Sequence, residues 1–330
     1  MSVPIVTIFG GSGFIGRQVA QRMARAGWRV RVAVRRPELA GFVRPYGFVG
    51  QVEPIQANIR DEASTRAAIV GATAVVNCTG ILSQSGKQTF GAVLDEGPAR
   101  IARLATEAGV ESLVHISAIG ADPASPSAYA AGKGRGEAAI LAAFRAAVIL
   151  RPSVVFGVGD SFFNKFASMA RISPVVPIVG PETRFQPVYV GDVVEAAARA
   201  ATGVVPAGIY ELGGPETVTF REIMARILRI IERRRLLFAI PAAIARIPAR
   251  ILDFVQRITG GLVANTLVTN DQITLLAKDN VVSGKLPGLA EIGIAPTAME
   301  AVLEDYLYVY RPHGQYAEIT ASARNLRPRT

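Results

Sequence analysis

The chain has 330 residues, 50% of them apolar, and a formal net charge of +10. Its 1 cysteine excludes an intrachain disulfide, its 2 histidines have no metal-ligand spacing, and no apolar run approaches the roughly 20 residues needed to cross a bilayer. The arginines are not interleaved with aromatic residues and no nucleic-acid-binding motif occurs, so we expect neither a metal site nor a nucleic-acid partner.

A glycine-rich motif, GGSGFIG, follows the first predicted strand, Val3–Phe9, and leads into a predicted helix, Gly13–Ala26. Such a unit presents unpaired N–H groups and the positive end of a helix to the pyrophosphate of a dinucleotide. The other interpretation is a glycine-rich turn that binds nothing. We expect the cofactor contacts of this motif to be Gly10, Gly11, Ser12, Gly13, Phe14, Ile15 and Gly16.

The second predicted strand, Arg29–Val34, ends in Arg35 and Arg36. An NAD-preferring site usually has an acidic residue at this point, which binds the ribose hydroxyls. Arginine suits a 2′-phosphate instead, so the sequence favours NADP(H) over NAD(H). The alternative is that both arginines are simply solvated residues at the end of the strand.

Two loops that follow the next strands add candidate cofactor residues. After the strand Val52–Gln56 comes Asp61, which either contacts the adenine or caps the following helix. The strand Ala74–Asn77 ends in Cys78, Thr79 and Gly80, a turn of small residues where backbone can run close to the adenosine ribose. Cys78 itself has the character of a small core residue.

Strands and helices alternate along the first half of the chain, which predicts a doubly wound parallel Rossmann sheet of the α/β class. The further predicted elements are strands at Leu113–Ile116, Ala147–Leu150 and Tyr210–Leu212 and helices at Ser64–Val70, Phe90–Ala108 and Ala128–Phe144. We assign 1–156 and 186–212 to this NAD(P)-binding domain. We assign 157–185 and 213–330 to a smaller, mostly helical C-terminal domain that faces a membrane or a partner.

Tyr129 and Lys133 are four residues apart in a predicted helix and therefore share one face. The lysine ammonium can lower the pKa of the phenol and bind the nicotinamide ribose, so that tyrosine donates or accepts a proton. Ser117 is the candidate for the third, hydroxyl member of a catalytic site. The residues after it are Ala118, Ile119 and Gly120, and Ser117 can equally be a hydrogen-bonding residue at a strand end.

Residues 221–258 are strongly basic, with nine arginines against three acidic side chains between Arg221 and Arg257. Within them Pro241–Ile258 predicts an amphipathic, basic helix that Pro248 would kink or divide. Its apolar side either lies in a membrane interface, with the arginines on anionic lipid, or packs into the core of its own domain.

These motifs together resemble the short-chain dehydrogenase/reductase superfamily, in its extended or atypical branch. The segments RPSVVFGVGDSFFNKFASMARISPVVPIVG, RFQPVYVGDVVEA and KLPGLAEIGIAPTAMEAV are similar to one family within it. This is the nucleotide-binding accessory subunit of respiratory complex I (NADH:ubiquinone oxidoreductase), subunit nine of the alpha subcomplex. The resemblance runs from Val3 to about Tyr316.

The resemblance implies a non-catalytic accessory subunit that holds NADPH as a structural cofactor and has complex I subunits as partners. It implies cofactor contacts by Gly10, Gly13, Gly16, Arg35, Tyr129 and Lys133 and a smaller domain close to the membrane surface. Because the glycine motif lies near Met1, we expect no presequence and a bacterial homologue, peripheral on the cytoplasmic face of the inner membrane. A free-standing NADP-dependent reductase or epimerase that uses the Tyr129–Lys133 pair remains the alternative, and a redox-sensing regulator is a third.

Overall fold

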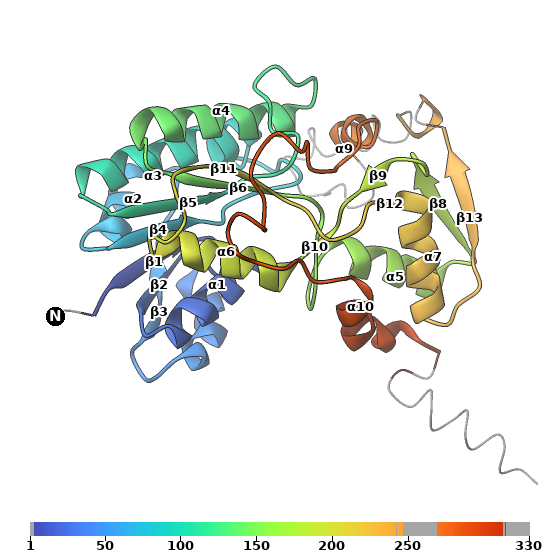
Figure 1. The fold of residues 1–330 in the computed structure, drawn as a ribbon, viewed down its shortest axis with the longest axis horizontal. Helices are drawn as coiled ribbons and strands as arrows, with labels where there is room; N and C mark the ends of the chain where they lie inside the picture. Colours follow the sequence, from blue (N-terminus) through green and yellow to red (C-terminus); the bar gives the residue numbers. More distant parts are fainter. Residues whose placement is uncertain (1–2, 242, 247–268, 313, 315–330) are drawn as a thin grey trace, which may run out of the picture.

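The structure is a computed structural model that describes residues 3–241, 243–246, 269–312 and 314. Its larger part is built on a seven-stranded sheet in which every neighbouring pair of strands is parallel (Figure 1). In spatial order the strands are β11 (Gly208–Leu212), β6 (Val148–Pro152), β5 (Ser112–Ile116), β4 (Ala74–Asn77), β1 (Ile5–Phe9), β2 (Arg29–Val34) and β3 (Val52–Gln56). The predicted doubly wound parallel sheet is confirmed.

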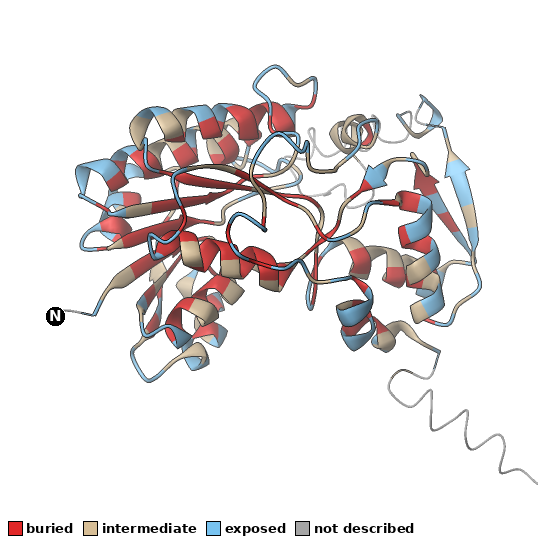
Figure 2. Ribbon diagram, viewed as in Figure 1, coloured by how far each residue is buried: buried red, intermediate tan, exposed pale blue. Residues whose placement is uncertain are grey.

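Helices cover both faces of this sheet (Figure 1). One face carries α1 (Phe14–Arg25) and α6 (Val190–Ala201), and the other carries α2 (Glu62–Ile69), α3 (Glu96–Glu107) and α4 (Ala128–Ala143). Side chains alternate between the faces along each strand. Val6 and Ile8 therefore join the core beneath α1 and α6, whereas Phe9 joins the opposite core. Figure 2 shows the sheet as mostly buried and the helices on both faces as buried only in part.

The segment predicted as one helix, Phe90–Ala108, is divided in the structure. A π-helical turn, η2 (Gly91–Asp95), precedes α3. Pro98 lies in the first turn of α3 and has no N–H to donate to the Leu94 carbonyl, so the regular hydrogen-bond ladder cannot run through this point. A 3-10 helix, η1 (Pro37–Tyr46), connects β2 to β3.

A second core, rich in aromatic residues, lies beside the carboxyl end of the large sheet. The elements that follow β6 around it are β7 (Val155–Phe156), α5 (Phe162–Ile172), β8 (Val175–Val179), β9 (Arg184–Phe185), β10 (Val188–Tyr189), β12 (Val218–Thr219), α7 (Phe220–Ile230), β13 (Leu236–Ile240), α9 (Asn270–Leu275), α10 (Glu300–Leu307) and η3 (Tyr308–Tyr310). The rings of Phe162, Phe166 and Phe220 contact one another with centroids 5.2–5.8 Å apart. Leu289 and Ile292 pack instead against the core of the large sheet.

The amphipathic helix predicted over Pro241–Ile258 lies mostly outside the described residues. The described part is helical at 243–246, where the Ile244 side chain is 58% exposed. No helix in the described part of the chain combines the length and the apolar character that crossing a bilayer requires.

Candidate functional site

The glycine-rich turn closes tightly at the carboxyl end of β1. The Gly10 N–H donates to the Ala33 carbonyl at 3.1 Å, and Gly10 has a φ of +71°, which favours glycine. A Cβ at Gly16 would stand 2.4 Å from the Gly10 carbonyl oxygen, closer than any side chain allows. The turn and the first turn of α1 therefore fit together only because these two positions lack side chains.

The N-terminus of α1 is free to bind an anion. Its cap residue, Gly13, is exposed and provides no side-chain cap, and the first turn holds no acidic residue. Ser12 is half-buried beside it. The side chains of Phe14 and Ile15 pack against the core, so what these two residues offer a ligand is their backbone N–H groups.

Arg35 and Arg36 follow β2 at the same edge of the sheet. Both are exposed, and no hydrogen bond or ion pair joins either guanidinium group to another described residue. The hydrogen bond between Gly10 and Ala33 fixes the end of β2 beside the glycine turn. Two exposed arginines therefore follow directly on a strand whose end lies beside the glycine turn.

The turn Cys78–Gly80 connects the glycine motif to Lys133. The Cys78 N–H donates to the Phe9 carbonyl at 2.9 Å, and a Cβ at Gly10 would contact the Cys78 carbonyl oxygen at 3.0 Å. A Cβ at Gly80 would stand 4.0 Å from Lys133 Nζ. Burial raises the pKa of the Cys78 thiol to about 12, against the opposing effect of the Lys133 charge. The thiol is thus uncharged at neutral pH, as expected of a small core residue.

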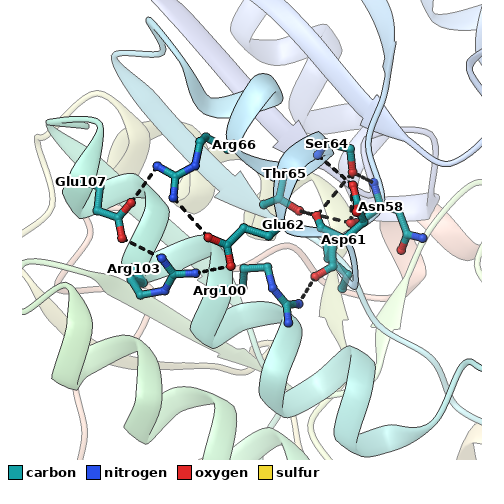
Figure 3. A network of polar contacts seen from close by, with 10 residues as sticks. Asn58, Asp61, Glu62, Ser64, Thr65, Arg66, Arg100, Arg103 and Glu107 are labelled. Carbon is teal, nitrogen blue, oxygen red and sulfur yellow. Dashed lines mark hydrogen bonds and ion pairs between the residues drawn. The ribbon is translucent and has the colours of Figure 1, made fainter.

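Asp61 caps helix α2. Its carboxylate accepts the Ser64 N–H at 2.8 Å, and hydrogen bonds from Ser64 lower its pKa (Figure 3). Of the two roles considered for Asp61, capping is the one that these contacts define. Its carboxylate is exposed, and an adenine contact stays a prediction.

Helix α4 carries Tyr129 and Lys133 to the carboxyl edge of the sheet. Lys133 is 3% exposed and donates to the Ile116 carbonyl at 2.8 Å, and the Tyr129 ring meets Phe90 edge-on with centroids 6.0 Å apart. Burial lowers the pKa of Lys133 to about 8, while the charge of Glu137 opposes this. Burial raises the pKa of Tyr129 to about 12, and the charge of Asp271 adds to the rise. The expected lowering of the phenol pKa by Lys133 is therefore wrong for this structure, because burial and the Asp271 charge raise that pKa.

Ser117 lies directly after β5, but its hydroxyl is engaged. It donates to the carboxylate of Glu137, which is 3% exposed and also accepts from Arg151 Nε at 3.0 Å and Nη2 at 2.5 Å. Glu137 follows Lys133 by four residues on the same face of α4. The serine hydroxyl therefore belongs to a buried ion-pair cluster on this face.

Several polar residues of this site were not singled out in the sequence. Asn77 and His115 are 0% exposed neighbours on β4 and β5, and the Asn77 Nδ2 and both ring nitrogens of His115 have no hydrogen-bond partner among the described residues. Burial holds the pKa of His115 well below its usual value. Asn77 could have been found from the sequence, because it lies at a strand end just before the Cys78 turn. Asp271 could not, because it is 142 residues from Tyr129.

The residues present fit a nicotinamide dinucleotide. The glycine turn is a cradle that a single Cβ would fill, and the α1 N-terminus favours phosphate. Within the part of the chain that the structure describes, the guanidinium groups of Arg35 and Arg36 and the Asn77 amide donor at the strand end have no partner. When bound, such a cofactor supplies hydride chemistry.

Comparison with known proteins defines the class. Residues 6–213 match the NAD dependent epimerase/dehydratase family, so the chain belongs to that family, which binds a nicotinamide dinucleotide. A more particular similarity covers nearly the whole chain. It is 30% identical over 326 residues to the mitochondrial NADH dehydrogenase (ubiquinone) 1 alpha subcomplex subunit 9 of Arabidopsis thaliana, covering 97% of this chain and 81% of that protein.

The chain is also similar to two other proteins, one by sequence and one by fold. The chain is 29% identical over 240 residues to the ceramide reductase of Caulobacter vibrioides, covering 72% of this chain and 74% of that protein. The structure of a dTDP-glucose 4,6-dehydratase from Streptomyces venezuelae, with NAD and TYD bound, matches with a TM-score of 0.70 and 18% identity over 96% of this chain and 99% of that one. That likeness concerns the fold.

Proposed function

We propose that the protein is an NADP(H)-binding, non-catalytic accessory subunit of respiratory complex I, in which the cofactor is structural. The observation that carries the proposal is the similarity to alpha subcomplex subunit 9, which extends over 97% of the chain and so includes the region beyond the dinucleotide-binding fold. The partners proposed are subunits of that complex.

NADP(H) is favoured over NAD(H) by Arg35 and Arg36. Their guanidinium groups are exposed, have no partner in the described part of the chain and follow the strand whose end is fixed beside the glycine turn. Arginine binds phosphate with charge-assisted, often bidentate hydrogen bonds, which suits the 2′-phosphate.

A non-catalytic role is supported by the state of Ser117. A reductase of this type needs a hydroxyl that can donate to the oxygen where charge develops. The Ser117 hydroxyl donates to Glu137, and the next three residues, Ala118, Ile119 and Gly120, have none. Tyr129 and Lys133 can hold a nicotinamide ribose without this third group.

The smaller domain, assigned to 157–185 and 213–330, is the part proposed to face the membrane. At its edge strand β13, Leu236 and Phe238 are 64% and 56% exposed, and exposed Arg234 precedes them at the same spacing of two. An apolar strip flanked by arginine suits a surface of anionic lipid. We place the protein on the cytoplasmic face of a bacterial inner membrane, as a peripheral subunit.

Purification of the tagged protein from its native membranes in mild detergent tests the proposal. We expect NADH:ubiquinone oxidoreductase subunits to co-purify, with stoichiometric NADP(H) identified by mass spectrometry. A Gly16→Val variant, which cannot form the turn, is the matched control for the nucleotide. Recovery of the wild-type protein alone from the soluble fraction would refute the accessory role.

A free-standing NADP-dependent reductase is the second candidate, favoured by the Tyr129–Lys133 pair on one face of α4 and by the similarity to ceramide reductase, a lipid-modifying enzyme by its name. Under this proposal Tyr129→Phe abolishes turnover of a lipophilic carbonyl substrate while NADPH stays bound. Equal turnover by Tyr129→Phe and the wild type would exclude it.

A further inference from the structure

A carboxylate from the C-terminal part of the chain is bound to the N-terminus of the helix that carries Tyr129 and Lys133. Asp271, in α9, accepts the Ala128 N–H at 2.7 Å through Oδ1. Its Oδ2 accepts the Ser127 hydroxyl at 2.9 Å and the Tyr129 N–H at 3.3 Å. Both carboxylate oxygens are therefore used on a single helix end.

These contacts complete the capping of α4. Ser127, its cap residue, accepts the Ala130 N–H at 3.2 Å. Asp271 accepts the N–H groups of the two preceding residues, Ala128 and Tyr129. Each of the first three amides of the helix therefore has an acceptor. A negative charge at this position also interacts favourably with the helix dipole.

The segment around Asp271, residues 269–282, is held firmly at its other end too. We call it the C-terminal strap. Thr183 donates to the Leu276 carbonyl at 2.5 Å, and the Ser153 hydroxyl, just beyond β6, donates to Asn280 Oδ1 at 2.7 Å. The strap thus extends from α4 to the end of β6, beside the second core (Figure 1).

We propose that Asp271 is a positioning residue: it fixes the first turn of α4, and with it Tyr129, so that the C-terminal strap closes one side of the dinucleotide site. This inference rests on the proposed function only in that the site takes NADP(H). Binding of the cofactor against Tyr129 and docking of the strap then stabilise each other by an equal amount, because coupling between two binding events is reciprocal.

The test compares Asp271→Ala and the milder Asp271→Asn with Asp279→Ala. Asp279 belongs to the same strap but pairs with Arg184 and not with α4, so it is a matched control. In the full-length protein without cofactor, we expect hydrogen exchange at the Ala128 and Tyr129 amides to become at least about fivefold faster in Asp271→Ala. Asp279→Ala should leave these amides unchanged.

Two further readouts separate positioning from general stability. NMR titration of ring-labelled tyrosine, with Tyr129→Phe to assign the signal, should give a lower phenol pKa in Asp271→Asn, because the charge that raises it is gone. NADPH titration should give a Kd about fivefold or more weaker in Asp271→Ala than in Asp279→Ala. Circular dichroism of each variant verifies that it is folded.

The outcomes distinguish the two proposals. Unchanged amide exchange and an unchanged phenol pKa in the Asp271 variants would overturn the positioning role. Changed exchange in a protein that binds no NADPH would support the contact of Asp271 with α4 but refute NADP(H) binding. Equal NADPH affinity in all variants, with changed exchange, would refute the coupling between strap and cofactor.

Discussion

Replacing Glu137 by alanine should destabilise the protein strongly, because Glu137 is the shared acceptor of a buried cluster. Its side chain is 4% exposed, and that of its ion-pair partner Arg151 is 18% exposed. The same carboxylate accepts the Ser117 hydroxyl. The variant leaves a guanidinium group and a hydroxyl without their acceptor at the carboxyl edge of the sheet.

The expected cost follows from this burial. Removing one partner of a buried ion pair costs about 3–5 kcal/mol, since the remaining charge is left uncompensated. Arg151 retains some access to water, which favours the lower end of that range, and the lost serine hydrogen bond adds about 1 kcal/mol. We therefore expect Glu137→Ala to lower the free energy of unfolding by about 3–4 kcal/mol, a large part of the stability of a typical domain.

Urea unfolding of the cofactor-free protein measures this, with Glu62→Ala as control. Glu62 pairs with Arg66 at 3.2 Å and Arg103 at 2.7 Å, but its side chain is 50% exposed (Figure 3). Such exposed pairs contribute little, so the control should change stability far less. A Glu137→Leu/Arg151→Met double variant should recover most of the loss, because the Arg151 charge is no longer left without its partner. If Glu137→Ala is no more destabilising than Glu62→Ala, the argument from burial is refuted.

Four further variants test the cofactor site. Arg35→Ser or Arg36→Ser should weaken NADPH binding about 10- to 100-fold, the loss of one charge-assisted hydrogen bond, with NADH affinity unchanged by calorimetry. Gly16→Ala should abolish binding of both nucleotides and lower the melting temperature, because its Cβ would stand 2.4 Å from the Gly10 carbonyl oxygen. Lys133→Met should remove a pH effect on stability, because burial lowers the pKa of Lys133 from 10.5 to about 8. Between pH 8 and pH 10.5 the unfolded chain binds more protons than the folded chain, so the free energy of unfolding rises with pH, by at most about 3 kcal/mol in total.

Each of these expectations has a control and a contradicting result. Arg25→Ser removes an exposed arginine at the far end of α1, and a similar loss of NADPH affinity there would mean that Arg35 and Arg36 act only through net charge. Gly41→Ala, where a Cβ meets nothing within 4 Å, should bind normally. A constant difference in unfolding free energy between wild type and Lys133→Met above pH 8 would show that Lys133 is not buried as described.

The order of strands and helices could be predicted from the sequence because local patterns determine it. Three strands, Arg29–Val34, Val52–Gln56 and Ala74–Asn77, have the predicted boundaries. Runs of apolar residues between polar turns define a buried parallel strand without reference to the rest of the chain. The helix over 90–108 was predicted as continuous because apolar periodicity does not report the missing N–H of Pro98.

Only those parts of the candidate site that lie within a short stretch of sequence could be predicted. The glycine turn and the Tyr129–Lys133 spacing are contained in short stretches of sequence. The partners that determine their behaviour come from elsewhere in the chain: Asp271 is 142 residues from Tyr129, and Arg151 lies 14 residues from Glu137 on a different element. Burial, which is the main cause of the raised pKa of the phenol, likewise depends on the folded chain and cannot be predicted from the spacing of two residues.

The two pKa values at the centre of the site bear on the choice between holding and using a cofactor. A general acid or base is most effective when its pKa lies near the working pH. The phenol of Tyr129, at about 12, keeps its proton at neutral pH, and Lys133, at about 8, is mostly charged. Both side chains are then hydrogen-bond donors, and the Ser117 hydroxyl donates its hydrogen bond to Glu137. A phenol that keeps its proton beside a charged ammonium group offers two donors that suit the retention of a nicotinamide ribose, as the proposed accessory role requires.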